Sequence, residues 1–273
     1  MERIKSAIEK AKYLQSTVSV RKQQVKIIKS KLEKNNELEN FSYLITRVVD
    51  LDPIHLEKNR IIAFNKNDNS SWAIDNIRTQ VLQIMEEKGW RTIAVVSPTS
   101  ESGKSVISIN LAISIAQQSQ WSAMLVDFDL RRPKVGKYLG LTMDKSLNDY
   151  LEDKAEVSEI LVNPHHPRLV IFPTARSVAK SSEILSSKKI SDLISELRDK
   201  YSSRIVIFDL PPVLTSDDVI AVLPKIDCTL LIIGNGMSSK SDIEETIHLL
   251  GSTNLLGVVL NKSKPVKNNY YYD

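Results

Sequence analysis

The sequence predicts an α/β fold in which a doubly wound, mostly parallel sheet has helices on both faces. Short, nearly continuous apolar runs alternate with longer stretches of helical spacing from residue 91 to residue 263. Strands that are apolar along their whole length are buried on both sides, which is typical of parallel sheets covered by helices. A chain of 273 residues with 42% apolar residues is long enough for one such domain and an appendage.

Six apolar runs are predicted to be strands of this sheet. They are 91–97, 122–129, 168–173, 204–211, 228–235 and 255–263. Helical spacing predicts helices over 72–87, 104–118, 181–201 and 241–251. Ligands of such sheets bind beyond the carboxyl ends of the strands, so polar residues at those ends are the candidate site residues.

Residues 1–34 are predicted to be a basic helical arm that precedes the sheet domain. They contain ten Lys or Arg against three Glu, and apolar residues recur every seven positions. Both a partner-binding arm and a helix folded onto its own domain are consistent with this pattern. Asparagine-rich stretches predict a linker over 35–70, so the domain is expected over 71–263, followed by a C-terminal tail at 264–273.

The composition favours a cytoplasmic location. The single cysteine, Cys228, excludes an intramolecular disulfide and suits a reducing compartment. The sequence contains no run of about 18 apolar residues, which a transmembrane helix would need. The charged start MERIKSAIEK does not resemble a secretory signal. Membrane association is therefore expected only peripherally, at the inner face, through a partner. The tryptophans flank predicted elements and favour packing roles, so no specific nucleic acid partner is expected.

The segment VVSPTSESGKSVISINLA, residues 95–112, joins a predicted strand to a predicted helix. This is the context of a phosphate-binding loop, in which backbone N–H groups and the start of the helix surround phosphates. Lys104 would reach the β and γ phosphates and the Ser105 hydroxyl would bind Mg²⁺. Pro98 stands where the standard pattern has glycine, so a simple helix cap is the alternative. The candidate nucleotide-binding residues are Ser100, Glu101, Ser102, Gly103, Lys104, Ser105 and Val106.

Three aspartates follow other predicted strands at the same edge of the sheet. Asp127 and Asp129 flank Phe128 in MLVDFDLRRP, and Asp209 ends the strand in RIVIFDLPP. Two carboxylates on one side of a strand repel each other by on the order of 1 kcal/mol unless a divalent cation lies near them. Their alternative role is to cap the following turn. With the loop, these residues predict a site for ATP and Mg²⁺.

In order and spacing, these motifs resemble those of the bacterial tyrosine kinases, the autokinases of capsular and exopolysaccharide export. The likeness covers residues 72–273 and includes LVDFDLRRP, VIFDLPPV, SSEILSSKK, TSDDVIAV and GVVLNKS. It implies a P-loop NTPase fold and an ATP-dependent protein-tyrosine autokinase that regulates polysaccharide polymerisation and export. It also implies a membrane polysaccharide co-polymerase, or chain-length regulator, and a cognate tyrosine phosphatase as partners. Whether the chain forms a homo-oligomer is left open.

The resemblance assigns roles to the residues at the strand ends. Lys104 and Ser105 would hold ATP and Mg²⁺, and Asp127 would help to activate the attacking tyrosine hydroxyl. Asp129 and Asp209 would organise the metal. The predicted Mg²⁺ set is therefore Ser105, Asp127, Asp129 and Asp209.

Further roles come from the same resemblance. Arg131 would stabilise charge on the transferring phosphate, with a surface ion pair as the alternative. Asn261 would contact the adenine base, with a simple turn residue as the alternative. The phosphate acceptors would be Tyr270, Tyr271 and Tyr272 in the tail KPVKNNYYYD.

The chain departs from the family pattern in two places. Ser100 and Glu101 replace a Pro-Gly pair, and a left-handed backbone at 101 would cost glutamate roughly 1–2 kcal/mol relative to glycine. Activity is therefore expected to be low. The family's ring-forming helix has a glutamate and two arginines, whereas this chain has Trp72, Asp75 and Arg78. The ring contact is expected to be lost.

Two other functions stay open from the sequence. One is a non-kinase ATP switch of the partition and division-site type, although such proteins carry an additional lysine early in the loop and SPTSES has none. The other is a degenerate scaffold for a membrane polysaccharide co-polymerase, which the glycine-poor loop favours.

Overall fold

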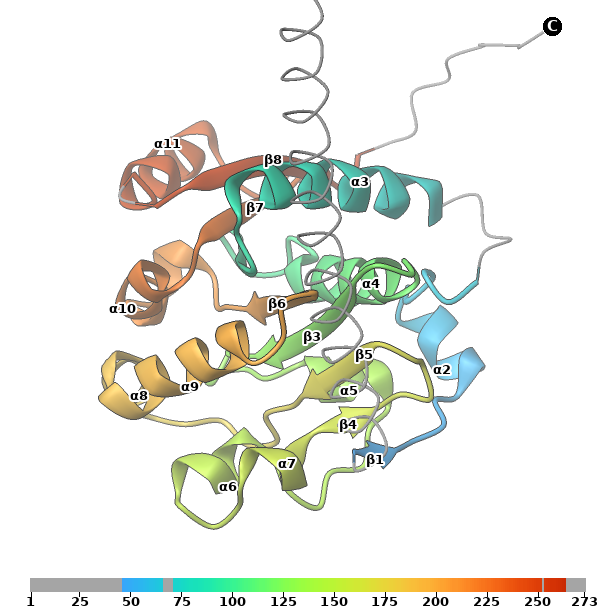
Figure 1. Ribbon diagram of the computed structural model, residues 1–273. Coiled ribbons are helices and arrows are strands. Elements are labelled where there is room, and N and C mark those ends of the chain that lie inside the picture. The colour runs from blue at the N-terminus through green and yellow to red at the C-terminus, as the bar shows by residue number, and fades with distance from the viewer. Residues whose placement is uncertain (1–45, 66–70, 252, 264–273) are drawn as a thin grey trace, which may run out of the picture. The chain divides into compact units, whose positions relative to one another are not determined.

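The computed structural model describes residues 46–65, 71–251 and 253–263, which belong to one compact unit that begins at Thr46. The predicted basic arm over 1–34 lies outside the described residues, and so does the predicted tail with its three tyrosines. The fold and the site are therefore built from the compact unit alone (Figure 1).

The described residues form an eight-stranded sheet in the order β1-β4-β5-β3-β6-β2-β7-β8. All neighbouring strands are parallel except β4 and β5, so the predicted mostly parallel sheet is confirmed. The strands are β1 (Arg47–Val48), β2 (Thr92–Val96), β3 (Ser122–Asp127), β4 (Val162–Asn163), β5 (Leu169–Phe172), β6 (Arg204–Asp209), β7 (Cys228–Gly234) and β8 (Leu255–Asn261).

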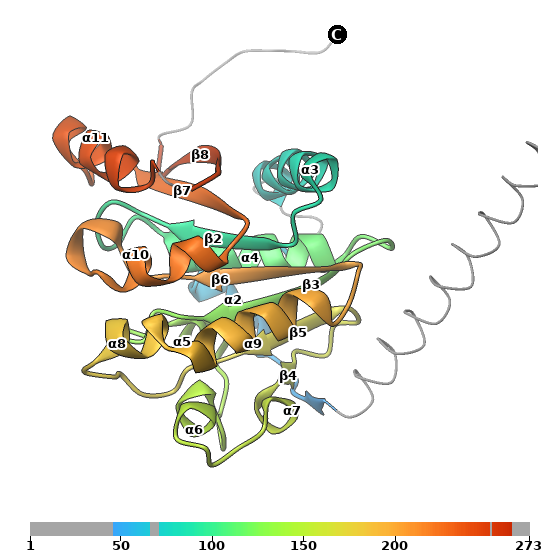
Figure 2. The same ribbon diagram turned by 60° about the vertical axis from the view of Figure 1, so that its left-hand side comes forward.

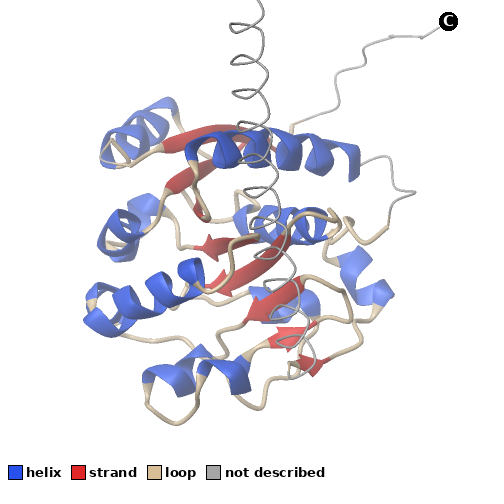
Figure 3. Ribbon diagram, viewed as in Figure 1, coloured by secondary structure: helices blue, strands red, loops and turns tan. Residues whose placement is uncertain are grey.

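Helices lie on both faces of the sheet, as Figures 2 and 3 show. They are α2 (Pro53–Lys58), α3 (Ser71–Lys88), α4 (Lys104–Ala116), α5 (Val135–Leu139), α6 (Leu147–Leu151), α7 (Val157–Ile160), α8 (Ser181–Ser186), α9 (Lys188–Asp199), α10 (Asp218–Val222) and α11 (Lys240–Leu249). Two short 3-10 helices, Val213–Thr215 and Leu223–Lys225, flank α10. Within the described part of the chain, every helix is too short or too polar to cross a bilayer.

Helix α4 is the central helix of one face, where it packs against β2, β3, β5 and β6. Its residues from Ile107 to Ala116 are all buried, because α3 and α5 cover its outer side. On the opposite face, α9 buries Ile190, Leu193, Ile194 and Leu197 at helical spacing. The start of α4 is thereby fixed over the middle of the sheet, where β2 ends.

The predicted linker over 35–70 is corrected by the packing of residues 46–65. Leu56, Ile61 and Ala63 are buried in the same apolar core as α3 and α4. The Asn110 side chain on α4 accepts hydrogen bonds from the backbone N–H groups of Ile62 and Ala63, at 2.8 and 2.9 Å. Its apolar residues lie in short groups between charged residues and show neither a helical nor a strand period, so the sequence pattern predicts a linker although the segment is part of the domain.

The last predicted strand is an edge strand rather than a buried one. Leu255, Val258 and Leu260 of β8 are 41%, 51% and 58% exposed. The cause is the strand order, because β8 has only β7 as a neighbour. An apolar run alone does not distinguish an edge strand from a central strand.

Arg78 of α3, the one arginine that this chain shares with the family's ring-forming helix, contacts residues of its own unit. Arg78 forms a 2.6 Å ion pair with Asp75 and donates a 3.0 Å hydrogen bond to Ser114 of α4. Trp72, at the position of the family's glutamate, is 70% exposed. Arg78 is thus engaged inside the unit, and the loss of the family's ring contact stays a prediction.

We expect Leu56→Ala to destabilise the protein by about 2–4 kcal/mol, because it removes a buried side chain from the core. Ile54→Ala is the matched control on the same helix. Ile54 is 77% exposed, so its loss should change stability by no more than about 0.5 kcal/mol. Urea unfolding measures both effects. Equal, small changes would show that α2 is a linker after all.

Candidate nucleotide-binding site

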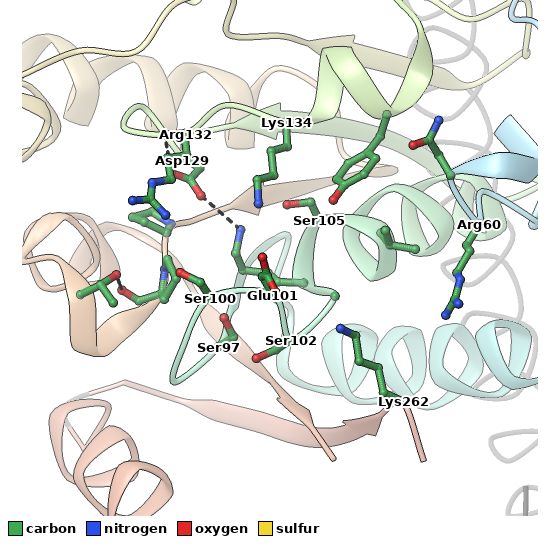
Figure 4. Close-up of a pocket in the computed structure, with 18 of the residues that line it drawn as sticks. Arg60, Ser97, Ser100, Glu101, Ser102, Ser105, Asp129, Arg132, Lys134 and Lys262 are labelled. Carbon is green, nitrogen blue, oxygen red and sulfur yellow. Dashed lines mark hydrogen bonds and ion pairs between the residues drawn. The ribbon is translucent and has the colours of Figure 1, made fainter. Parts of the chain in front are cut away.

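A cavity of about 570 Å³ opens where β2, β3 and β6 end (Figure 4). The loop between β2 and α4 forms its floor, and all seven residues from Ser100 to Val106 line it. Asp129 and Arg131 line it from the loop after β3, and Pro211 and Pro212 from the loop after β6. The structure thus brings the predicted loop and the predicted strand ends to one place.

Hydrogen bonds within the loop fix its turn. The hydroxyls of Ser97 and Ser102 both donate to the carbonyl oxygen of Thr99, at 2.9 and 3.0 Å. Gly103 precedes α4 with φ at 89°, in the left-handed region. A Cβ atom there would lie 2.2 Å from Asn261 Nδ2, so glycine is required at this position for both reasons.

Asn261 stabilises the loop from the end of β8. Its side-chain Nδ2 donates a 2.9 Å hydrogen bond to the carbonyl oxygen of Ser102. Asn261 is not among the residues that line the cavity, whereas its neighbour Lys262 is. In this structure Asn261 is therefore a loop-positioning residue, and its predicted adenine contact stays a prediction.

Glu101 has a left-handed backbone, with φ at 64°. This is the conformation that the family's glycine would adopt with less strain, and glutamate there costs roughly 1–2 kcal/mol. The side chain also adds a negative charge to the cavity wall. The backbone strain lowers the stability of the loop, and the negative charge opposes phosphate binding.

Lys104 is the central cation of the site. Its Nζ lies 2.7 Å from Asp209 Oδ1 and 3.8 Å from Asp129 Oδ2, and the residue is 6% exposed. Ser108 donates a further hydrogen bond to Asp209 Oδ1 at 3.0 Å. A buried ammonium without carboxylate partners would be strongly unfavourable, so these contacts offset the cost of burying Lys104.

Asp127 lies behind the cavity rather than in its wall. Its Oδ1 accepts from the backbone N–H of Asp129 at 3.2 Å, and its Oδ2 accepts from those of Lys134 and Val135 at 3.0 and 2.9 Å. Burial raises the pKa of Asp127 well above its ordinary value, and the neighbouring Asp209 raises it further. The turn-capping alternative is thus realised here, and the carboxylate fixes the backbone that carries Asp129.

Asp129 is the aspartate that faces the cavity. Burial raises its pKa, while Lys104 acts in the opposite direction. Its Oδ1 accepts a hydrogen bond from the backbone N–H of Arg132 at 3.0 Å, which orients the carboxylate. A carboxylate with a raised pKa, next to a cation and open to a cavity, is suited to accept a proton.

Arg131 lines the cavity and is held by two aspartates at the start of α10. Its guanidinium lies 3.2 Å from Asp217 and 3.2 Å from Asp218, and its Nε donates to Ser181 at 3.0 Å. The hydrogen bond with Asp218 raises the pKa of Arg131. The ion-pair alternative is realised in this structure, and the motifs that contain Ser181 and Asp218 meet at this arginine.

The sequence analysis missed most of the positive charge of the site. Seven Lys or Arg side chains line the cavity, against the two carboxylates of Glu101 and Asp129. The cations beyond Lys104 and Arg131 are Lys58, Arg60, Arg132, Lys134 and Lys262. Lys58 and Arg60 lie in the predicted linker, where no motif identified them. Such an excess of positive charge suits a polyanionic ligand.

The residues present fit a divalent cation held mainly by phosphate and water. The described ranges contain no group of three or more His, Cys, Asp or Glu placed to hold a metal ion. Asp209 Oδ2, however, is buried and has no hydrogen-bond partner, and Ser105 lines the cavity nearby. Mg²⁺ is commonly bound by one or two protein groups together with phosphates, so these two residues are suitable contacts.

The fold and this loop define the chain as a P-loop nucleotide-binding protein. Residues 93–272 match the CobQ/CobB/MinD/ParA nucleotide binding domain. The chain is 30% identical over 183 residues to the tyrosine-protein kinase CpsD of Streptococcus pneumoniae serotype 4, covering 66% of this chain and 79% of CpsD. The chain belongs to the bacterial tyrosine kinase family within that nucleotide-binding group.

Two further relatives agree with this assignment. The tyrosine-protein kinase ptk of Acinetobacter johnsonii is 28% identical over 67% of this chain, but the match spans only a quarter of ptk, 25%. The solved kinase domain of the Escherichia coli tyrosine kinase ETK superposes with a TM-score of 0.67 at 23% identity, over 77% of this chain and 84% of that domain. At this identity the likeness to ETK supports the fold.

We expect Glu101→Gly to tighten ATP binding roughly fivefold, because it removes about 1 kcal/mol of repulsion together with backbone strain. Asp153→Gly is the matched control, since Asp153 also has a positive φ, 58°, but lies outside the cavity. Calorimetric titration of both variants measures the effect. Unchanged ATP affinity in Glu101→Gly would show that the glutamate does not oppose binding.

We expect Asp127→Asn to weaken the fall of the thermal unfolding midpoint between about pH 4 and pH 8 by about 2–4 °C, which corresponds to ~1 kcal/mol in a domain of this size. Because asparagine also removes one acceptor of the backbone N–H groups, the change is measured within each protein as a difference between the two pH values. The raised pKa means that the folded chain holds the Asp127 proton more tightly than the unfolded chain does. Stability is therefore lost as the pH rises from the unfolded pKa through the folded pKa, and asparagine abolishes that loss.

Melting curves from about pH 4 to pH 8 measure this difference, since the unfolded Asp pKa is near 3.9. The exposed Asp192→Asn serves as the control and should follow the wild type. An Asp127→Asn variant whose unfolding midpoint falls with pH as much as that of the wild type would contradict the account.

Proposed function

We propose that this protein is a protein-tyrosine autokinase that uses ATP. The observation that carries this proposal is that Lys104, which lines a cavity with an excess of positive charge, contacts both Asp129 in the cavity wall and the buried Asp209. The relatives CpsD and ptk are named tyrosine-protein kinases, which supports the same activity. The loop also lacks the second lysine of the partition and division-site ATPases, so that alternative is not favoured.

Nucleotide binding would use the loop and its lysine together. The residues from Ser100 to Val106 line the cavity, where their backbone N–H groups and the positive dipole at the start of α4 would surround the phosphates. Lys104 would exchange Asp209 for the β and γ phosphates, so one anionic partner replaces another. This exchange keeps the buried ammonium paired in both states, which limits the cost of binding.

Phosphoryl transfer needs a tyrosine hydroxyl placed in line with the γ-phosphate. The phenolic oxygen attacks the γ-phosphorus, the bond to the bridging oxygen breaks, and ADP leaves with that oxygen. Asp129 would accept the phenolic proton, since it faces the cavity, and Asp127 would position it through the backbone of residue 129. Mg²⁺, held beside Ser105 and Asp209, would neutralise charge on the phosphates.

Arg131 would shape the entrance for the acceptor. It remains bound to Asp217 and Asp218 at the edge of the cavity, so its charge is partly neutralised before any ligand binds. A contact with the transferring phosphate would use Nη1, because Nε and Nη2 hold Ser181 and the two aspartates. We propose that Tyr270, Tyr271 and Tyr272 are the acceptors, and that Asn261 contacts the adenine base in addition to holding the loop.

The proposed biological setting follows from the relatives. The activity would regulate capsule or exopolysaccharide polymerisation through a membrane polysaccharide co-polymerase, with a tyrosine phosphatase reversing the modification. Binding to that co-polymerase would place the protein at the inner face of the membrane.

Incubation of the purified chain with Mg-ATP should give phosphotyrosine, detected by mass spectrometry. Lys104→Met should abolish the signal, because the phosphates then lose their buried cation. Replacing Tyr270, Tyr271 and Tyr272 together by phenylalanine should remove most of it, whereas Tyr150→Phe should not. ATP hydrolysis without phosphotyrosine would indicate a switch ATPase, and the absence of ATP binding would indicate a scaffold.

A further inference from the structure

Part of the cavity wall comes from outside the matched nucleotide-binding domain. Lys58 and Arg60, at the end of α2, line the cavity although the match to the family begins at residue 93. Lys262, just after β8, lines it as well. Figure 4 shows Arg60 and Lys262 at one end of the cavity and Asp129 and Arg132 at the other, with Ser105 between them.

The cations at this end have no carboxylate partner within residues 46–65, 71–251 and 253–263. None of Lys58, Arg60 and Lys262 forms an ion pair with a carboxylate among the residues that the structure describes. Arg131, at the other end, is held by two aspartates. Like charges that share one cavity repel each other, so an anion bound between them would relieve the repulsion.

Two of these cations stand on strained backbone. Arg60 and Lys262 have φ angles of 61° and 58°, where glycine or asparagine fits better than a long side chain. Among the described residues, six non-glycine positions have a positive φ, and three of them, the third being Glu101, line this cavity. Strained positions of this kind cluster at ligand-binding sites.

Each of the two cations is fixed to the phosphate loop by an asparagine. Asn110 Nδ2 donates to the carbonyl oxygens of Arg60 and of Val106, at 3.0 and 2.8 Å, and so joins the end of α2 to the first turn of α4. Asn261, next to Lys262, donates to the carbonyl oxygen of Ser102. The backbones of both cations are thus positioned relative to the loop before a ligand arrives.

We propose that Arg60 and Lys262 form a clamp on the α-phosphate of the bound nucleotide. In a phosphate loop the lysine reaches the β and γ phosphates, while the last backbone N–H groups surround the α and β phosphates. Asn110 joins Val106, at the end of the loop, to Arg60, whereas Lys104 is paired with Asp129. The proposal rests on the proposed nucleotide binding and adds the residues that bind the α-phosphate of the nucleotide.

The test measures affinity for ATP and for inorganic tripolyphosphate by calorimetry, with the full chain. Arg60→Asn and Lys262→Asn remove the charge but keep a residue that tolerates a left-handed backbone. Each should weaken both ligands about tenfold, the usual size of a charge-assisted contact. Lys137→Ala, which removes an exposed cation of α5 outside the cavity, should bind like the wild type. Arg60→Lys should restore most of the affinity.

The outcomes separate this proposal from the proposed function. If Arg60→Asn and Lys262→Asn bind both ligands with wild-type affinity and form phosphotyrosine normally, the clamp proposal is wrong and the proposed kinase function still holds. Weakened ATP with unchanged tripolyphosphate overturns the α-phosphate assignment, because the contact is then to the nucleoside. A wild-type chain that binds neither ligand refutes the proposed function itself. Unchanged thermal unfolding of the variants excludes a loss of fold.

Discussion

The pairing of one buried lysine with buried carboxylates is the interaction on which the rest of the site depends. Lys104 contacts Asp209 at 2.7 Å, and Asp127 is the partner of Asp209 in the β3–β6 register. Carboxylates on adjacent parallel strands repel each other, and their burial adds to that cost. Lys104 reduces both costs, because it pairs with Asp209 and its charge also attracts Asp127. The sheet register, which places Asp127 beside Asp209, and the loop, which supplies Lys104, are therefore coupled electrostatically. The buried carboxylates need the lysine, and the buried lysine needs a carboxylate.

Several features of the site disfavour the folded state of the protein. Asp127 has its pKa raised by burial and by Asp209, and Glu101, Arg60 and Lys262 adopt left-handed backbone conformations. Each of these features disfavours the folded state, and each lies at or behind one cavity. A polyanionic ligand with its metal would compensate several of them at once, since it adds negative charge beside the cations and positive charge beside the carboxylates.

Periodicity and strand ends were enough to predict most of this from the sequence. All six predicted strands are present, and the loop, Asp129 and Asp209 meet where the parallel strands end. The register that places Asp127 beside Asp209, and the amides that occupy its oxygens, depend on tertiary contacts that no local pattern contains. The α2 segment was misjudged because its core contacts come from only a few isolated positions, such as Leu56 and Ile61. For the same reason its two cavity cations were not found.

A crystal structure of the chain with Mg²⁺ and a non-hydrolysable ATP analogue tests the central claim most directly. The account predicts that Lys104 Nζ leaves Asp209 and contacts the β and γ phosphates, while the loop from Ser100 to Val106 surrounds them. An analogue bound elsewhere, with the 2.7 Å contact between Lys104 and Asp209 unchanged, would contradict it.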